Sequence, residues 1–200
     1  MEKSAAGRSS EEIFAAPTRN VVELTAAINQ SLATSGINAY SVRNTAIIAK
    51  KKRSILYRNG YTLPASAARL LAEAQSNIKH SSKLGRNLRK AHSTTTRPRE
   101  TDAHHIVASE AAAAHPSRVL IFAVGIGIND ADNGVLLPRG RTTRVASLPD
   151  ASPHQIIHTP TYHANVIAEL YGADDTGDAS EIRGILKSIG SRLVRGHFAF

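Results

Sequence analysis

Three segments of the chain carry side chains that could together bind a metal ion and move a proton. The first holds the pair His104-His105, the second holds Asn133 before a glycine, and the third holds His154 and His158. Neutral imidazole binds transition metals and also accepts a proton near pH 7. The set therefore suits hydrolysis of a phosphodiester, in which a metal acts as Lewis acid while a histidine activates water.

The two neighbouring histidines can take different roles. Consecutive side chains on an extended segment point to opposite sides, so either His104 or His105 could reach a metal while the other faces a substrate. The spacing does not decide which histidine does which. Asn133 could bond nearby backbone, as asparagine commonly does in turns, and so brace the loop that orients the catalytic histidine.

The metal would be held by histidines from two of these segments. His154 and His158 are four residues apart, so on a helix they share one face and can hold one ion. With His104 they offer three nitrogen ligands and leave a position for water or phosphate. Such a set favours zinc or nickel over magnesium, which prefers oxygen ligands. We expect one divalent metal ion, with zinc, nickel and magnesium left open as its identity.

The charge of the chain is concentrated before these segments. The net charge is +9, and residues 41–99 hold 14 Lys and Arg against one acidic residue, Glu73. Such a stretch attracts polyanions. The alternative is that these charged residues simply form the solvent-exposed surface of a helix. We expect a nucleic acid or an acidic protein as partner. The residues expected to bind phosphates are Lys50, Lys51, Lys52, Arg53, Arg86, Arg89 and Lys90.

The residues before the first histidine pair are expected to be mainly helical. Residues 1–18 are predicted to be a flexible lead-in, and residues 19–95 a basic helical region. Apolar spacing predicts helices near 21–32, 42–57 and 65–91. Residues 93–99 form a polar linker. Because the chain contains no cysteine, disulfides and thiolate metal sites are excluded.

The residues from 96 onward should combine short strands and helices. The strands predicted there are a β-capable segment at 105–107 and a strand at 135–137. The apolar segment at 119–124 could be a buried strand or the end of a helix. The predicted helices are one at 109–114 that stops before Pro116, one from His154 that is disturbed at Pro160 and resumes to Leu170, and one at 181–194. His163 and four further histidines, His80, His92, His115 and His197, are expected at the surface.

Three segments resemble a known family. The runs Ala103–Ala108, Gly127–Pro138 and Ile157–His163 are similar to the AHH nucleases of the HNH, or His-Me finger (ββα-metal), superfamily, and the likeness covers about residues 84–172. The resemblance implies an α+β fold, mostly helical, with a small ββα-metal core. It also implies that residues 96–200 form an HNH/AHH nuclease domain.

The resemblance assigns a role to each residue of the set. His105, the second histidine of the pair, would be the general base. His104 and His158 would bind the metal, and His154 would complete the site, as in the His-x-x-x-His of colicin-type DNases. Asn133 would orient the base.

The expected function is that of a metal-dependent endonuclease toxin that cleaves DNA with little sequence preference. Domains of this family are typically the toxic tips of bacterial polymorphic toxins. The resemblance therefore implies an antibacterial effector that acts in the cytoplasm of a target cell and is neutralised in the producer by a cognate immunity protein. Residues 1–8 contain no apolar run, so we expect no signal peptide in this chain, and no run of 18 apolar residues predicts membrane insertion. Two alternatives stay open: an RNase with the same site, and a non-catalytic nucleic-acid-binding module with a structural zinc.

Overall fold

The computed structural model describes residues 54–93, 96–173 and 178–200. The predicted lead-in at 1–18, the helix near 21–32 and the basic residues Lys50 to Arg53 lie outside these ranges. Within them, no helix is long and apolar enough to cross a membrane.

The described part of the chain begins with a short hairpin. Strand β1, Tyr57–Arg58, pairs antiparallel with β2, Tyr61–Thr62, so the prediction that a helix extends to Tyr57 is wrong. Asn59 and Gly60 have φ angles of 50° and 89°, and two positive values in succession are what a two-residue hairpin turn requires. A Cβ atom at Gly60 would also lie 2.3 Å from the carbonyl oxygen of Asn87.

The helix predicted over 65–91 is two helices. Helix α3 spans Ala67–Ala74 and α4 spans His80–Ala91. Between them the Ser76 hydroxyl donates a hydrogen bond to the Glu73 carbonyl oxygen at 2.6 Å. Serine competes with the helical backbone in this way, and the chain turns before α4 begins.

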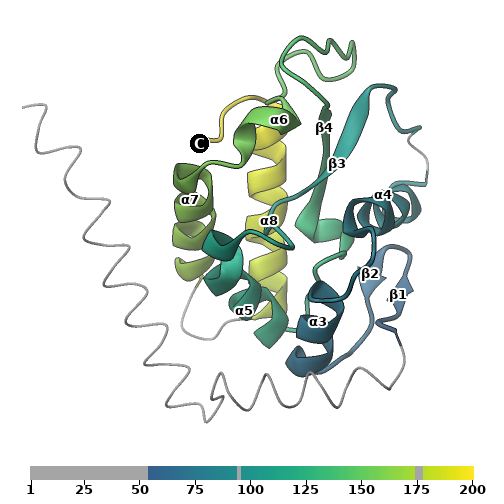
Figure 1. The fold of residues 1–200 in the computed structure, drawn as a ribbon, viewed down its shortest axis with the longest axis vertical. Helices are drawn as coiled ribbons and strands as arrows, with labels where there is room; N and C mark the ends of the chain where they lie inside the picture. Colours follow the sequence, from purple (N-terminus) through teal and green to yellow (C-terminus); the bar gives the residue numbers. More distant parts are fainter. Residues whose placement is uncertain (1–53, 94–95, 174–177) are drawn as a thin grey trace, which may run out of the picture. The chain divides into compact units, whose positions relative to one another are not determined.

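The centre of the fold is a second antiparallel strand pair (Figure 1). Strand β3, Thr101–His105, pairs with β4, Gly134–Pro138, in a register that sets Thr101 opposite Pro138 and His105 opposite Gly134. The strand predicted at 135–137 is confirmed, and β3 begins four residues earlier than the predicted β-capable segment. Helix α4 packs against β3 and β4, and helix α8, Ala179–Val194, packs against β4.

The remaining helices connect these parts. They are the short 3-10 turns η1, Ala112–Ala114, and η2, Ala131–Asn133, with helices α5, His115–Ala123, α6, His154–Ile157, and α7, Pro160–Tyr171. The prediction that a helix stops before Pro116 is wrong, because α5 starts at His115 and includes Pro116 in its first turn. Proline is tolerated in a first helical turn, where its missing N–H needs no partner. The predicted break at Pro160 is confirmed, and the Thr159 side chain accepts a hydrogen bond from the backbone N–H of Tyr162 at 3.0 Å.

One hydrophobic core joins residues from both sides of position 95. Ile55 and Leu70 share it with Ile106, Ile121 and Leu186. The predicted apolar face of the last helix is confirmed, since its buried residues include Ile182, Leu186, Ile189 and Leu193. The α+β fold class is confirmed. The domain boundaries expected at 18 and 95 remain predictions.

Candidate active site

Three of the expected metal ligands come together. One nitrogen each from His104, His154 and His158 lies within 4.8 Å of the others. His104 is fully buried on β3, His154 is the first residue of α6, and His158 follows the last residue of that helix. The Nε2 atoms of His154 and His158 are 3.4 Å apart. Two ligands of a tetrahedral zinc site with Zn–N bonds of about 2.1 Å are also separated by about 3.4 Å.

His104 offers a ring nitrogen without a partner. Its buried Nδ1 makes no hydrogen bond within the described residues, and its Nε2 lies 2.9 Å from the Tyr162 hydroxyl. That hydroxyl donates to the Ile106 carbonyl oxygen at 2.9 Å, so it accepts from Nε2–H of His104. The lone pair of His104 is therefore on Nδ1. A buried nitrogen left unpaired is unfavourable unless something binds it, and the three histidines fit a metal ion.

The electrostatics of the cluster favour neutral imidazoles. Burial lowers the pKa of His104, and the neighbouring histidines lower it further. Burial also lowers the pKa values of His154 and His158, although Asp102, 3.9 Å from His154, opposes the shift there. Metal ions bind the neutral form of the imidazole ring, so these three histidines could bind a metal near pH 7 without first losing a proton.

The ring of His105 has different neighbours from that of His104. Its Nε2 lies 3.3 Å from Oδ1 of Asn129, and its ring centroid is 6.4 Å from that of His80. Burial lowers the pKa of His105 to about 4. The ring is therefore neutral at pH 7 and can accept a proton.

Asn133 holds the backbone that follows His105. Its Oδ1 accepts from the Val107 N–H at 2.8 Å, and its Nδ2 donates to the carbonyl oxygens of Val107 and Ile128 at 3.2 and 2.8 Å. Its own carbonyl oxygen accepts from the Ile106 N–H at 3.0 Å. Asn133 is fully buried. These contacts make it a brace for the loop rather than a partner of the His105 ring.

Three residues beside the histidines were missed in the sequence. Tyr162 contacts His104, while Asn129 and His80 lie beside His105. The surface positions predicted for His80 and His163 are wrong, since their exposed fractions are 5% and 6%. The position of Asn129 four residues before Asn133, in the same loop, is the one signal that could have indicated it.

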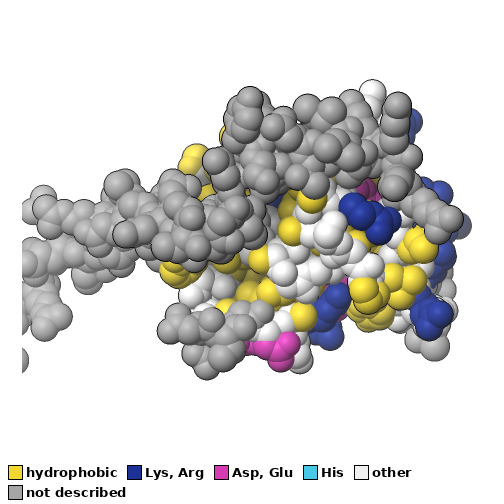
Figure 2. Space-filling view, turned by 90° about the horizontal axis from the view of Figure 1, so that it is seen from below, with side chains coloured by type: hydrophobic (Ala, Val, Ile, Leu, Met, Phe, Trp, Pro, Cys, Tyr) yellow, Lys and Arg dark blue, Asp and Glu magenta, His cyan; other side chains and the backbone are white. Residues whose placement is uncertain are grey.

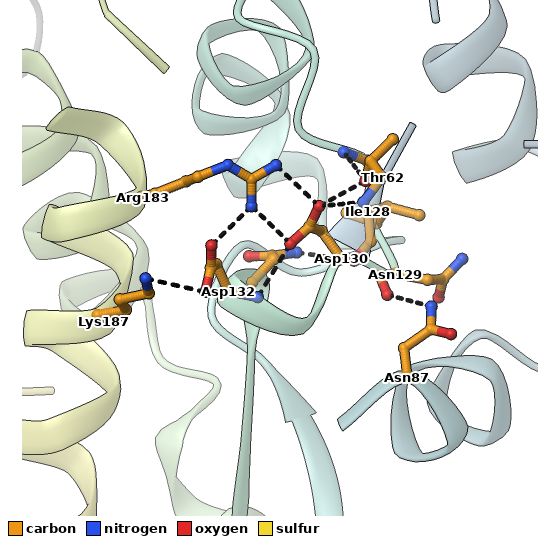
Figure 3. A network of polar contacts seen from close by, with 10 residues as sticks. Thr62, Asn87, Ile128, Asn129, Asp130, Asp132, Arg183 and Lys187 are labelled. Atoms are coloured by element: carbon orange, nitrogen blue, oxygen red, sulfur yellow. Dashed lines mark hydrogen bonds and ion pairs between the residues drawn. The ribbon is translucent and has the colours of Figure 1, made fainter. Parts of the chain in front are cut away.

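Ion pairs anchor the loop that carries Asn129 and Asn133 (Figure 3). The fully buried carboxylate of Asp130 accepts from the backbone N–H and the hydroxyl of Thr62 at 2.7 and 2.6 Å. It also accepts from two guanidinium nitrogens of Arg183 at 2.9 and 3.1 Å, and Arg183 reaches Asp132 at 2.6 Å. Strand β2 and helix α8 are thus joined through this loop.

Arg183→Met should destabilise the fold strongly. It leaves two nearly buried carboxylates, Asp130 and Asp132, without their main partner, and breaking such a pair costs about 3 kcal/mol or more. Lys187→Met is the matched control on the same helix, because the Lys187 side chain is 63% exposed and 3.7 Å from Asp132. The control should cost less than about 1 kcal/mol. Urea unfolding measures both, and equal small losses would contradict the anchoring role.

Acid should destabilise the metal-free protein. His105 takes up a proton near pH 4 in the folded state but near 6.5 in the unfolded chain. As the pH falls from 6.5 to 4 the unfolded state binds more protons, so this residue lowers the free energy of unfolding by about 3 kcal/mol. Above pH 6.5 its contribution is constant. Denaturant titrations across this range test the effect; His105→Gln should show a smaller loss, and an equal loss would contradict this assignment.

A cationic groove runs along α4. Its volume is about 710 Å³, and the residues that line it are Ile78, Lys79, Ser82, Lys83, Gly85, Arg86, Arg89 and Arg97. Five of these carry positive charge and none is acidic. Lys83 is paired with Glu73. Arg86 and Arg89 were among the expected phosphate contacts, whereas Lys90 is exposed but does not line the groove.

The groove belongs to a wider distribution of positive charge. Figure 2 shows Lys and Arg side chains at the right of the face seen from below, on the side where Figure 1 places α4 and the β1–β2 hairpin. The phosphate contacts expected from Lys50 to Arg53 lie outside the described residues.

The described residues thus contain a three-histidine cluster that could hold one ion, a neutral buried histidine and a cationic groove. The family follows from a comparison with family models. The model of AHH, a nuclease family of the HNH/ENDO VII superfamily with conserved AHH, matches residues 86–193. The chain belongs to this family, and nuclease is its class of activity. Ala103, His104 and His105 at the end of β3 are its AHH residues. No curated protein and no solved structure matches the chain.

Proposed function

We propose that the protein is a metal-dependent endonuclease that hydrolyses DNA with little sequence preference. The observation that carries the proposal is the unpartnered Nδ1 of buried His104, next to His154 and His158, with neutral His105 as its neighbour in the chain. A histidine cluster for the ion and a separate histidine for the proton divide the two tasks that phosphodiester hydrolysis requires.

Each residue has one part in this reaction. His104, His154 and His158 hold the ion, which when bound supplies a Lewis acid for the phosphate oxygens. His105 accepts the proton of the attacking water. Asn133 fixes the backbone after His105 through its bonds to Val107. The nitrogen ligands favour zinc or nickel as the ion, ahead of magnesium.

The groove along α4 supports a substrate held by its phosphates. Its lining contains Lys and Arg side chains and no aromatic ring. Contacts between cations and phosphates position nucleic acid without reading its sequence, so cleavage with little sequence preference follows. The same contacts make the affinity fall with salt.

A plasmid-nicking assay tests the function. The metal-free protein is incubated with supercoiled DNA and magnesium, manganese, nickel or zinc, with and without chelator. Nicking that a chelator abolishes and a metal restores is the expected result. A protein that binds DNA but cleaves it with none of the metals would instead support a non-catalytic module with a structural zinc. Cleavage of RNA but not of DNA would show that RNA, and not DNA, is the substrate.

Removing two cations from the groove should weaken binding to any DNA sequence. Arg86→Gln combined with Arg89→Gln removes two phosphate contacts, so the salt slope of the binding constant should fall by about 2. Fluorescence anisotropy at several salt concentrations measures the slope. Arg141→Gln, an exposed position outside the groove, is the control and should change it little. Equal salt slopes in the wild type, the double variant and the control would exclude the groove as the DNA-binding surface.

We further propose that the protein is an antibacterial effector that acts in the cytoplasm of a target cell and that a cognate immunity protein neutralises. The support is the resemblance of its motif segments to the toxic domains of bacterial polymorphic toxins. Induced expression in bacteria should stop growth and degrade DNA, and His105→Ala should remove both effects. Normal growth with active protein in the cell would contradict the toxin role.

A further inference from the structure

Two buried side chains connect His105 to the start of α4. Asn129 is fully buried, and its Oδ1 lies 3.3 Å from Nε2 of His105. Its Nδ2 lies 3.1 Å from Nδ1 of His80, and its Oδ1 lies 3.3 Å from the same nitrogen. The other ring nitrogen of His80, Nε2, is 3.3 Å from the carbonyl oxygen of Ser76. His80 and Ser76 both precede the residues that match the family model, 86–193.

The direction of every hydrogen bond in this chain follows from its last member. A carbonyl oxygen only accepts, so Nε2 of His80 carries the proton that bonds Ser76. With its one ring proton on Nε2, His80 has its lone pair on Nδ1, which accepts from the nearer group of Asn129, the amide NH₂. That contact turns Oδ1 of Asn129 toward His105. Oδ1 also only accepts, so Nε2 of His105 carries a proton.

The reverse arrangement is unfavourable. If the amide of Asn129 were flipped, its Oδ1 would face Nδ1 of His80, and that nitrogen would need the proton. With that one ring proton on Nδ1, Nε2 of His80 would direct a lone pair at the Ser76 carbonyl oxygen. A buried donor or acceptor that loses its partner costs about 1–3 kcal/mol.

The position of Asn129 is itself fixed. Its carbonyl oxygen accepts from Nδ2 of Asn87 on α4 at 2.7 Å, and the next residue, Asp130, is held by Thr62 and Arg183 (Figure 3). The amide group therefore has a rigid backbone on one side and two imidazole rings on the other. Rotation of the His105 ring would break its contact with Oδ1.

We propose that Asn129 and His80 are positioning residues that hold His105 as the Nε2–H tautomer, so that Nδ1 is the atom that accepts the proton from water. The proposal rests on the proposed function for the role of His105. Nδ1 makes no hydrogen bond with the part of the chain that the structure describes, which leaves it available. A general base must present its unprotonated nitrogen to the water, and a fixed hydrogen bond on the other nitrogen ensures this.

The kinetic test uses one substitution of Asn129 and a pair of substitutions of His80. Asn129→Ala and His80→Leu remove the link and should lower kcat by at least about 10-fold, with KM for plasmid DNA and bound metal unchanged. His80→Asn keeps a polar group near the place of Nδ1 and should restore most of the activity. His92→Leu, at the exposed end of the same helix, is the control. Full kcat in His80→Leu, or an equal loss in His80→Asn, would overturn the proposal.

A spectroscopic test does not depend on activity. The imidazole ¹⁵N shifts and N–H couplings of His105 report its tautomer, and the wild-type protein should show Nε2–H alone. His80→Leu should give a mixture of tautomers. Nδ1–H in the wild type would overturn the proposal even if a variant failed to fold. Wild-type protein that is inactive on all nucleic acids would refute the proposed function but leave this tautomer measurement valid.

Discussion

His105→Ala is expected to give a protein that folds and retains its metal ion but cleaves plasmid DNA about 10²- to 10⁴-fold more slowly. The reason is that a positioned general base contributes about 10² to 10⁴ in rate, and His105 is the neutral imidazole directly next to the metal cluster in the chain. Its ring makes its hydrogen bond with Asn129, and it is not one of the three clustered histidines. Single-turnover cleavage, together with measured metal content, checks both parts of the expectation.

The outcome has a clear control. His92→Ala removes a histidine from an exposed position and should cleave at the wild-type rate. If His105→Ala retained full activity, His105 would not be the base and the reaction would need another proton acceptor. Loss of the metal in His105→Ala would place this residue among the ligands instead.

Substitution of a metal ligand is expected to remove both the ion and the activity. His104→Ala and His158→Ala each leave two nitrogen donors of the three that come within 4.8 Å of one another. Changes to residues that only support a ligand cost about 10- to 100-fold in metal affinity, so loss of a ligand should cost more than about 100-fold. Competition with a chromophoric chelator measures the affinity.

Tyr162→Phe provides a graded comparison. The change removes the hydroxyl that accepts from Nε2–H of His104 but leaves the three donors in place. It should weaken metal binding by about 10- to 100-fold, less than either alanine substitution. Unchanged metal affinity in His158→Ala would remove that residue from the ligand set, and a Tyr162→Phe effect as large as that of His104→Ala would contradict a supporting role.

The metal cluster could be predicted because it is encoded by short sequence patterns, namely a histidine pair and two histidines four residues apart, that occur in the same chain. His154 and His158 have the spacing of one helical turn, and the structure brings their Nε2 atoms to 3.4 Å. Strand β4 and helix α8 were also predictable, since β-branched and apolar residues at the right period mark them. In α8 the apolar residues Ile182, Leu186 and Leu193 are all buried.

The surroundings of His105 could not be predicted in the same way. His80 has polar neighbours in the sequence, and a continuous helix over 65–91 would have given it no reason to be buried. Its burial depends on the turn at 75–79. In this turn the Ser76 hydroxyl donates a hydrogen bond to the Glu73 carbonyl oxygen. The contact with Asn129 spans 49 residues, and no local pattern encodes such a distance.

Turn geometry explains two further differences. Asn59-Gly60 is a turn signal, but the two strands beside it are two residues each, too short for alternation to be visible. Pro116 was interpreted as the end of a helix, although proline fits the first turn equally well. In both cases the residue types indicate that the chain changes direction or that a helix has an end nearby. They do not indicate which element lies on each side.

The contact of the β1–β2 hairpin with the η2 loop has a practical consequence for dissecting the protein. The Gly60 carbonyl oxygen accepts from the Ala131 N–H at 3.0 Å, and Thr62 holds Asp130. The family model starts at residue 86, inside α4, so a recombinant fragment cut there would lose the hairpin, α3 and His80. The smallest fragment that retains these contacts must start before β1, and the boundary of sequence similarity is therefore a poor guide to where the folding unit begins.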